Sequence, residues 1–175
     1  SLKPKRFEEI VALVALIRPG PLGANMHIEF ADRATGKKEI EFLHEDLKVI
    51  LEETHGVILY QEQVMQIAQR ISGFQLDEAD DLRKAMGKKI PKVMEQQRKK
   101  FTDGAIKKGY SEQFSVELFD QIAFFAGYGF NKSHSVPYAL IAYQTAYLKA
   151  NFPAEYLSAC LTAVKRDKER TAVFL

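Results

Sequence analysis

The chain has 175 residues, of which 46% are hydrophobic and 27% are charged, and its formal net charge is +2. This length and composition predict a single globular domain with a real hydrophobic core, and they exclude an intrinsically disordered chain. No apolar run is long enough to cross a bilayer, and no secretory signal opens the sequence. The lone Cys160 cannot form an intramolecular disulfide. We therefore expect a cytoplasmic protein without a membrane partner.

Charge is unevenly distributed along the sequence. Between Arg83 and Lys108 there are ten basic and two acidic residues, a formal charge of +8. Between Glu29 and Glu62 there are nine acidic and four basic residues, a formal charge of −5. A basic run is often no more than a solvated helix face, but a polyanion would be attracted to the first stretch and not to the second.

Helical spacing of apolar residues runs through most of the chain and predicts an all-α fold. The expected helices cover residues 7–17, 44–53, 61–71, 78–86, 91–108, 112–126, 136–151 and 153–163. We expect Asp77 to cap the helix over 78–86 and Gly87 to end it. Residues 22–42 show no sustained period, which predicts irregular structure. The apolar run over 57–60 is either a brief strand or a buried lead-in to the next helix.

Residues 125–138, here called the bend, read FAGYGFNKSHSVPY and combine flexible backbone with polar side chains. Two glycines flank Tyr128, and glycine adopts left-handed conformations freely. Four polar side chains follow, and we expect Ser135 to cap a helix that begins at Val136, with Pro137 in its first turn. Donors that precede a helix N-terminus favour an anion, so the pattern predicts a phosphate site. An ordinary solvated turn between two helices is the alternative.

Two further groups of residues lie on the helices before and after the bend. The following helix carries four aromatic residues, which are more typical of a packed core than of cofactor stacking: Tyr138, Tyr143, Tyr147 and Phe152. Gln61 and Gln63 open an earlier helix. Their amides either contact a base edge or a sugar, or are simply solvated.

The sequence contains no recognisable catalytic metal site. Two-metal phosphoryl transfer needs carboxylates that converge on both ions, usually from a strand or a rigid turn. Asp80 and Asp81 are adjacent, and helix neighbours point roughly 100° apart, so they do not readily share ions. The histidines are scattered, and neither zinc-ligand spacing nor a Gly-x-x-x-x-Gly-Lys-Ser/Thr loop occurs. We expect no catalytic residue, metal or cofactor in this chain.

Long sequence blocks stand in order along the chain: Tyr60-Gln-Glu-Gln-Val-Met65, Leu82-Arg-Lys-Ala-Met-Gly-Lys-Lys89 and Phe125-Ala-Gly-Tyr-Gly-Phe-Asn-Lys-Ser-His134. Together they resemble the fingers region of the C family of bacterial replicative DNA polymerases, the alpha subunits of DNA polymerase III. The similarity extends from Arg18-Pro-Gly-Pro21 to Leu161-Thr-Ala163, nearly the whole chain. Ordered blocks of this length are far more specific than a single short motif. The resemblance implies that residues 1–175 are one helical fingers-domain fragment, without palm or thumb.

The resemblance also implies which residues bind substrates. The expected nucleotide-binding residues are Arg83, Lys84, Tyr128, Phe130, Asn131, Lys132 and His134, and the expected DNA-binding residues are Gln61, Gln63, Lys88 and Lys89. The family often has two adjacent arginines where this chain has Arg83 and Lys84, and lysine keeps the charge but lacks the bidentate fork of a guanidinium. Pro137 stands where the family more often has a small residue.

The implied function is part of DNA-directed DNA synthesis. The implied partners are a deoxynucleoside triphosphate (dNTP), template-primer DNA, the remaining polymerase domains and the replisome subunits of the holoenzyme. Mg²⁺ and the catalytic aspartates belong to the palm in this family, so we expect this chain alone to be inactive. A sequence-nonspecific DNA-binding module and a helical protein-interaction scaffold are the alternatives at this stage.

Overall fold

A computed structural model describes residues 2–88 and 90–173, and within these residues the chain is all-α, which confirms the predicted fold class. The first helices are α1 (Phe7–Leu16), α2 (Pro19–Gly23), α3 (Met26–Ala34), the 3₁₀-helix η1 (Glu45–Leu47), α4 (Lys48–Leu51), the 3₁₀-helix η2 (Glu52–Thr54) and α5 (Gln61–Ser72). The later helices are α6 (Leu76–Lys88), α7 (Pro91–Lys107), α8 (Glu112–Ala126), α9 (Lys132–Asn151), α10 (Pro153–Val164) and α11 (Lys168–Val173).

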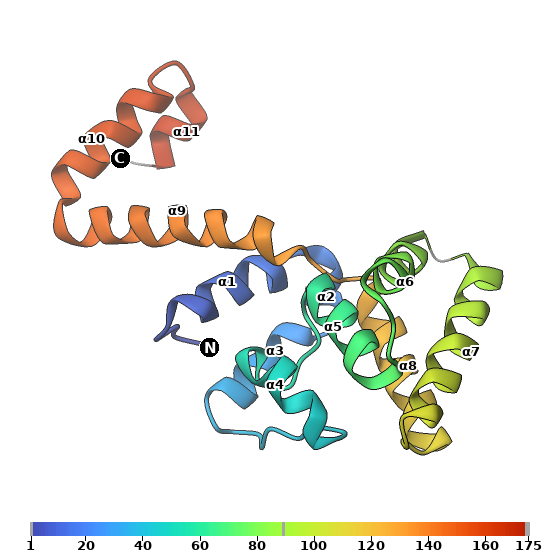
Figure 1. The fold of residues 1–175 in the computed structure, drawn as a ribbon. Coiled ribbons are helices and arrows are strands. Elements are labelled where there is room, and N and C mark those ends of the chain that lie inside the picture. The colour runs from blue at the N-terminus through green and yellow to red at the C-terminus, as the bar shows by residue number, and fades with distance from the viewer. Residues whose placement is uncertain (1, 89, 174–175) are drawn as a thin grey trace.

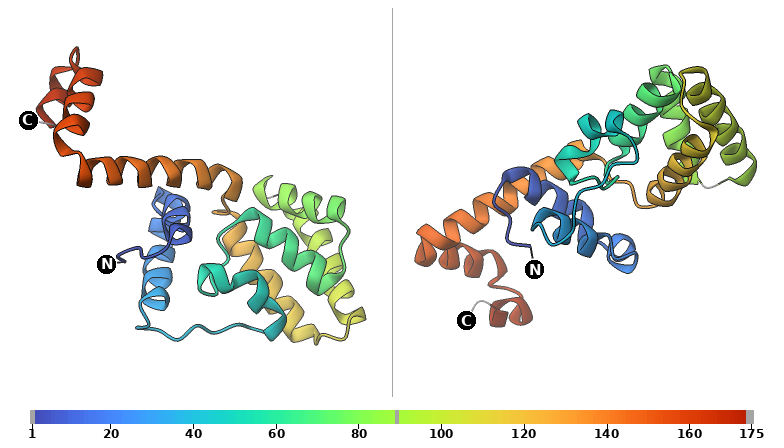
Figure 2. Two further views of the ribbon diagram at one scale, coloured as in Figure 1. Left: turned by 60° about the vertical axis from the view of Figure 1, so that its left-hand side comes forward. Right: turned by 90° about the horizontal axis from the view of Figure 1, so that it is seen from below.

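A helical body carries one long projecting helix (Figures 1 and 2). In the body, α5, α6, α7 and α8 pack on one another, and α1 packs against the beginning of α9. The far end of α9 carries α10 and α11 away from the body. Within the described residues, no helix combines the length and the apolar character that crossing a bilayer requires.

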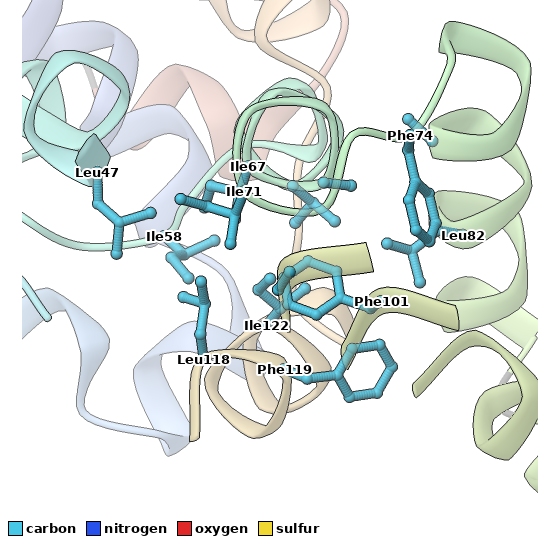
Figure 3. Close-up of a cluster of buried hydrophobic side chains, with 14 of the residues drawn as sticks. Leu47, Ile58, Ile67, Ile71, Phe74, Leu82, Phe101, Leu118, Phe119 and Ile122 are labelled. Carbon is cyan, nitrogen blue, oxygen red and sulfur yellow. The ribbon is translucent and has the colours of Figure 1, made fainter. Parts of the chain in front are cut away.

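The larger hydrophobic core lies between α5 and the three helices that follow it (Figure 3). The apolar face of α5 faces this core, with Val64, Ile67, Ala68 and Ile71. The ring of Phe101 on α7 packs 6.2 Å from Phe74 and 5.5 Å from Phe119, measured between ring centroids. Burying a side chain of this size contributes roughly 1.5–3 kcal/mol before entropy is counted. This core therefore makes α5 the central helix of the body.

A smaller core joins α1, α3 and the start of α9, and residues 57–60 run between the two cores. Ile58 packs in the larger core, whereas the other three residues of this segment pack in the smaller one. All four are 3% exposed or less. A segment buried on both sides needs no polar face, which explains its continuous apolar run. Of the two predicted alternatives, the structure has the buried lead-in, with a parallel β-bridge between Tyr60 and Phe130.

Residues 22–42 were predicted to be irregular, but they contain α3. Its buried face consists of Met26 and Phe30, which lie one turn apart. Two apolar positions are too few for a periodic pattern to stand out, so the helix was not predicted. The Arg18-Pro-Gly-Pro21 block does end α1, as predicted, but Pro19 then opens the short α2. Proline is tolerated there because the first helical N–H needs no partner within the helix.

Helix α6 is longer than predicted at both ends. It begins at Leu76, so Asp77 lies in its first turn and is not the cap. The carboxylate of Glu78, a residue of the first turn, accepts from the backbone N–H of Gln75 over 2.8 Å and so stabilises the start of the helix. The helix also continues through Gly87, which was predicted to end it.

Helix α9 corrects a second prediction, because its aromatic residues lie on the surface and not in a core. Tyr138, Tyr143, Tyr147 and Phe152 are 53%, 51%, 50% and 48% exposed. Within the described residues, α9 packs chiefly on α1 near its start and on α10 near its end. The apolar side chains of a helix normally pack against another element. The projecting helix therefore presents apolar surface that the described residues do not cover.

Candidate functional site

The bend is fixed to the body through its backbone. The N–H of Phe130 donates to the carbonyl of Leu59 over 3.1 Å, and the N–H of Gln61 donates to the carbonyl of Phe130 over 3.0 Å. These two bonds form the bridge between Tyr60 and Phe130. Because residues 57–60 are buried between two cores, the bend is attached to one of the most buried segments of the molecule.

Gln63 holds this buried segment in place. Its Oε1 accepts from the N–H groups of Leu59 and Tyr60 at 2.8 and 2.9 Å. Its Nε2 donates to Thr54 Oγ1 at 2.8 Å and to the Ile50 carbonyl at 3.3 Å. Gln63 is 5% exposed and its amide is fully bonded. A buried amide with four partners is not available to a nucleic acid in this conformation, which argues against the predicted DNA contact of Gln63.

Arg18 and Gly20 hold the first part of the bend. Arg18 donates through Nη2 to the carbonyl of Tyr128 over 2.6 Å and through Nε to the carbonyl of Ala15 over 2.7 Å. Its guanidinium carbon lies 4.3 Å from the centroid of the Phe130 ring. A Cβ atom on Gly20 would lie 2.7 Å from Cδ1 of Tyr128, so the missing side chain lets the tyrosine ring rest on α2.

Helix α9 begins one turn earlier than predicted. Asn131 is the N-cap, and its Oδ1 accepts from the N–H of His134 over 2.8 Å. Ser135, the predicted cap, is buried, and its hydroxyl donates to the Val11 carbonyl over 3.0 Å and so fixes α9 to α1. Asparagine and serine cap helices about equally well, so local preference did not separate them. Pro137 consequently lies in the second turn and not in the first.

Two carboxylates hold Lys132, one at each end of the residue. Its Nζ lies 2.6 Å from Oε2 of Glu53, and its backbone N–H donates to both carboxylate oxygens of Glu62 over 3.1 Å. The ammonium also lies 5.6 Å from the centroid of the Tyr60 ring. Burial raises the pKa of the Tyr60 phenol, and the charges of Glu53 and Glu62 raise it further. The predicted phosphate-binding cation is thus part of a compact charged cluster.

His134 lies next to this cluster on the first turn of α9. Its ring is exposed and lies between those of Phe130 and Tyr138, with centroid separations of 5.4 and 4.7 Å. These aromatic contacts orient the imidazole and leave it accessible.

A small pocket joins α6 to the bend. It has a cavity volume of about 20 Å³ and is lined by Gln61, Val64, Arg83, Met86, Gly87 and Gly129. Arg83 and Gln61 therefore lie beside the bend, although Lys132 and His134 are not part of this lining. Within α6, Asp80 pairs with Arg83 at 2.8 Å and with Lys84 at 2.7 Å. These cations are balanced along their own helix, which is the ordinary arrangement for neighbours three and four residues apart.

The remaining predicted DNA contacts lie at the end of α6. Lys88 is exposed there, as expected for a residue that contacts a nucleic acid. Lys89 lies outside the described residues. The structure thus brings Gln61 and Arg83 beside Gly129 of the bend, and leaves Lys84 and Lys88 exposed.

Sequence reasoning missed the residues that hold the bend: Arg18, Gly20, Glu53 and Glu62. The first two belong to the Arg18-Pro-Gly-Pro21 block, which was given no role in the bend, and the two glutamates belong to the acidic stretch. Their partners in the bend lie 70 to 110 residues away, so no local spacing pattern marks them. The left-handed backbone that Gly127 would permit is not used, because its φ of −64° is right-handed helical.

The carboxylates of the described residues do not form a catalytic metal centre. No group of three or more His, Cys, Asp or Glu among them is arranged to hold a metal ion. Glu53 and Glu62 are bonded to Lys132, and Asp80 is paired within α6. The donor set of the described residues therefore does not fit a two-metal site.

The helical body, the bend and the ordered sequence blocks together define a polymerase fingers domain. Residues 1–109 match the family model of the bacterial DNA polymerase III alpha subunit finger domain, and the chain belongs to this family. This finding favours the polymerase hypothesis over an unrelated DNA-binding module or an interaction scaffold.

The matches to full-length relatives include the bend, which lies beyond residue 109. The DNA polymerase III subunit alpha of Campylobacter jejuni is 51% identical over 174 residues, which cover 99% of this chain and 14% of the relative. The Escherichia coli (strain K12) protein is 52% identical over 97% of this chain and 15% of its own length. The Mycobacterium tuberculosis protein is 48% identical over 99% of this chain and 15% of its own length. The chain thus spans only 14–15% of the length of these curated relatives.

Proposed function

We propose that this chain forms the substrate-contacting fingers of a DNA-directed DNA polymerase, and that the bend holds the phosphate tail of the incoming dNTP. The supporting observation is the bend itself, where Lys132 and His134 occupy the first turn of α9 behind the Asn131 cap. A cationic side chain and an exposed imidazole at a helix N-terminus favour a polyanion. The relatives named DNA polymerase III subunit alpha support polymerisation as the activity of the whole protein.

Each residue of the site has a proposed role. Lys132, His134 and Arg83 contact phosphate oxygens, Asn131 contacts the sugar or a phosphate, Tyr128 and Phe130 line the nucleotide, and Lys84 supports the phosphate contacts. To contact a phosphate, Arg83 has to share or leave its ion pair with Asp80. Positioning and charge compensation are the main contributions of protein groups to phosphoryl transfer.

Bond formation itself is assigned to the rest of the protein. In this proposal Mg²⁺ and the carboxylates that hold it belong to the palm, outside residues 1–175. The described residues bind the triphosphate, orient it and neutralise its charge. The chain alone is therefore expected to incorporate no nucleotide.

The exposed cations of α6 and α7 support a second contact, to the backbone of template-primer DNA. Lys88, Lys92 and Lys99 are exposed, and Gln61 lies half-exposed beside the bend. Lys89 belongs to the same proposal from its place in the sequence. Each phosphate contact that is lost should reduce the salt dependence of DNA binding by about 0.9 in the log–log slope. The other polymerase domains and the replisome subunits of the holoenzyme complete the proposed partners.

Steady-state kinetics of the full-length polymerase test the nucleotide site. We expect Lys132→Ala and His134→Ala each to raise the KM for dNTP about tenfold, because a charge-assisted hydrogen bond contributes about 1.5–3 kcal/mol and tenfold corresponds to about 1.4 kcal/mol. The affinity for template-primer should stay unchanged. Lys149→Ala removes an exposed cation from the last turn of the same helix and serves as the control. An unchanged KM in both site variants contradicts the proposal.

A further inference from the structure

The charged cluster around Lys132 contains two polar groups without partners. Oε1 of Glu53 and the hydroxyl of Tyr60 are buried, and neither has a hydrogen-bond partner among the described residues. Tyr60 is 1% exposed, so water does not readily reach its hydroxyl. Buried polar groups are usually bonded, and an unmade bond is costly. The contacts seen around Lys132 therefore leave the cluster incompletely satisfied.

The two glutamates differ in how firmly they are held. Glu62 lies in the first turn of α5, and its carboxylate accepts from the N–H of Lys132, the first residue of α9. It thus lies between two helix N-termini, and both helix dipoles favour its negative charge. Glu53 lies in η2, and its described contact to the bend is a side-chain ion pair whose partners are 36% and 38% exposed. An ion pair with this exposure is weak and exchangeable.

We propose, building on the proposed function, that Glu62 and Glu53 are positioning residues for the triphosphate. Glu62 fixes the N-terminus of α9, and Glu53 holds the Lys132 ammonium in place and releases it to a phosphate oxygen when the nucleotide binds. The contacts at 3.1 Å and 2.6 Å place the two carboxylates on the two donor groups of one residue.

The exchange conserves charge and moves no proton. Lys132 remains an ammonium and changes its anionic partner from a carboxylate to a phosphate oxygen. The released Glu53 remains a carboxylate and can accept from the Tyr60 hydroxyl, so both orphaned groups gain a partner. The Lys132 ammonium lies 2.6 Å from Oε2 of Glu53 and 5.6 Å from the centroid of the Tyr60 ring, which places the three groups in one neighbourhood. One ion pair is thus replaced by another ion pair and a hydrogen bond.

Steady-state kinetics of the full-length polymerase separate the two roles. Glu53→Gln should lower the KM for dNTP about threefold at unchanged kcat. The phosphate would no longer compete with the Glu53 carboxylate for the Lys132 ammonium, and the ion pair that is removed is as weak as a surface ion pair. Glu62→Gln should raise KM about tenfold, because the first N–H of α9 loses its charged partner. Asp120→Asn removes the partner of Arg98 in an ion pair between α8 and α7 that does not involve the bend, and it should change neither constant.

A double-mutant cycle tests whether Glu53 acts through the lysine. In a Lys132→Ala background, Glu53→Gln should leave KM unchanged, whereas two independent effects would add. Glu53→Ala gives a second variant that cannot rebuild the contact through an amide. If Lys132→Ala raises KM but neither Glu53 variant lowers it, the exchange is overturned and the nucleotide site stands. If Lys132→Ala itself leaves KM unchanged, the proposed function fails and the exchange fails with it.

Discussion

The two sides of the bend are held by different forces. On the side that precedes Asn131, the tyrosine ring rests against Gly20, and the backbone bonds to Arg18 and Leu59. These contacts depend on shape and on directed hydrogen bonds. On the side that follows Asn131, two carboxylates hold Lys132 through an ion pair and through the first N–H of α9. These contacts depend on charge.

This difference separates what can move from what cannot. A phosphate group competes with a carboxylate for an ammonium, but it does not compete with a packed ring or with a backbone bridge. The bend is therefore a fixed platform beside an exchangeable cation. Packing substitutions should act on the platform, whereas charge substitutions and pH should act on the side of Lys132.

The largest loss in the free energy of unfolding is expected at Gln63, which holds the buried segment to which both sides of the bend are attached. Gln63→Leu would leave the buried N–H groups of Leu59 and Tyr60 without an acceptor, whereas the Thr54 hydroxyl would lose one donor but keep its bond to the Val57 carbonyl. Each such group costs about 1–3 kcal/mol, so we expect the free energy of unfolding of residues 1–175 to fall by about 3 kcal/mol. Urea unfolding measures it. Gln61→Leu, at a half-exposed neighbouring position, should cost less than about 0.5 kcal/mol. Equal losses in the two variants would remove Gln63 as the common support.

A smaller effect is expected for Arg18→Met, which acts on the platform alone. Methionine keeps the length of the side chain but loses the bond to the Tyr128 carbonyl and the contact with the Phe130 ring. A charged hydrogen bond and a cation–π contact together predict a loss of about 2 kcal/mol. In the full-length polymerase, Arg18→Lys should reverse only part of the increase in the KM for dNTP that Arg18→Met causes, because an ammonium lacks the planar fork of a guanidinium. Full recovery would show that charge alone is needed at this position.

The sequence predicts the body of the fold well because the body depends on local pattern. The apolar residues of α5 are spaced as on one face of a helix, and that face is the buried one. His55 and Gly56, whose residue types favour a left-handed backbone after a helix, both have positive φ. Helix α3 was missed because two buried residues make no period. The aromatic face of α9 was expected in a core but is exposed, since apolar character indicates burial without identifying the partner.

The candidate site could be located from the sequence but not assembled. Its polar residues stand together in the bend, so their identity was visible. The contacts that orient them come from residues 70 to 110 positions away, which no local pattern reveals. Asn131 and Ser135 are both good caps, and only the hydroxyl contact of Ser135 with α1 decides between them. The nucleotide contacts themselves stay a prediction.

Gly20→Ala tests the platform more finely. The added methyl group would lie 2.7 Å from the Tyr128 ring, so the ring must shift, and overpacking of this kind costs about 1–2 kcal/mol. Gly23→Ala is a matched control in the same short helix, because a Cβ atom there meets no atom within 4 Å. We expect a lower thermal midpoint and an altered near-UV circular dichroism signal for the first variant and neither change for the second. Identical spectra in the two variants would contradict the close contact between α2 and the bend.

The smallest effect concerns pH, and it acts through the segment that carries Glu53. His55 follows η2 in a left-handed conformation, with φ of 52°, and its ring packs edge-on against Phe30 at 5.1 Å. Burial lowers the pKa of His55, whereas the charge of Glu9 opposes this and that of Arg6 adds to it. The unfolded chain therefore takes up a proton near pH 6.5 that the folded chain does not. The free energy of unfolding should fall as pH drops through 6.5, by less than about 1 kcal/mol for this partly solvated group.

His55→Asn isolates this contribution, because asparagine tolerates the left-handed backbone and does not titrate. Urea midpoints at pH 7.5 and pH 5.5 should differ more in the wild type than in the variant. In the full-length polymerase the same pH change should affect the KM for dNTP more in the wild type than in His55→Asn. Protonation of the partly buried His55 ring would displace η2, which it follows directly, and this displacement would move Glu53. Arg18→Lys should not change the size of this pH effect, since its contacts lie on the other side of the bend. Equal pH dependence of wild type and His55→Asn would show that the charged side of the bend is not coupled to this histidine.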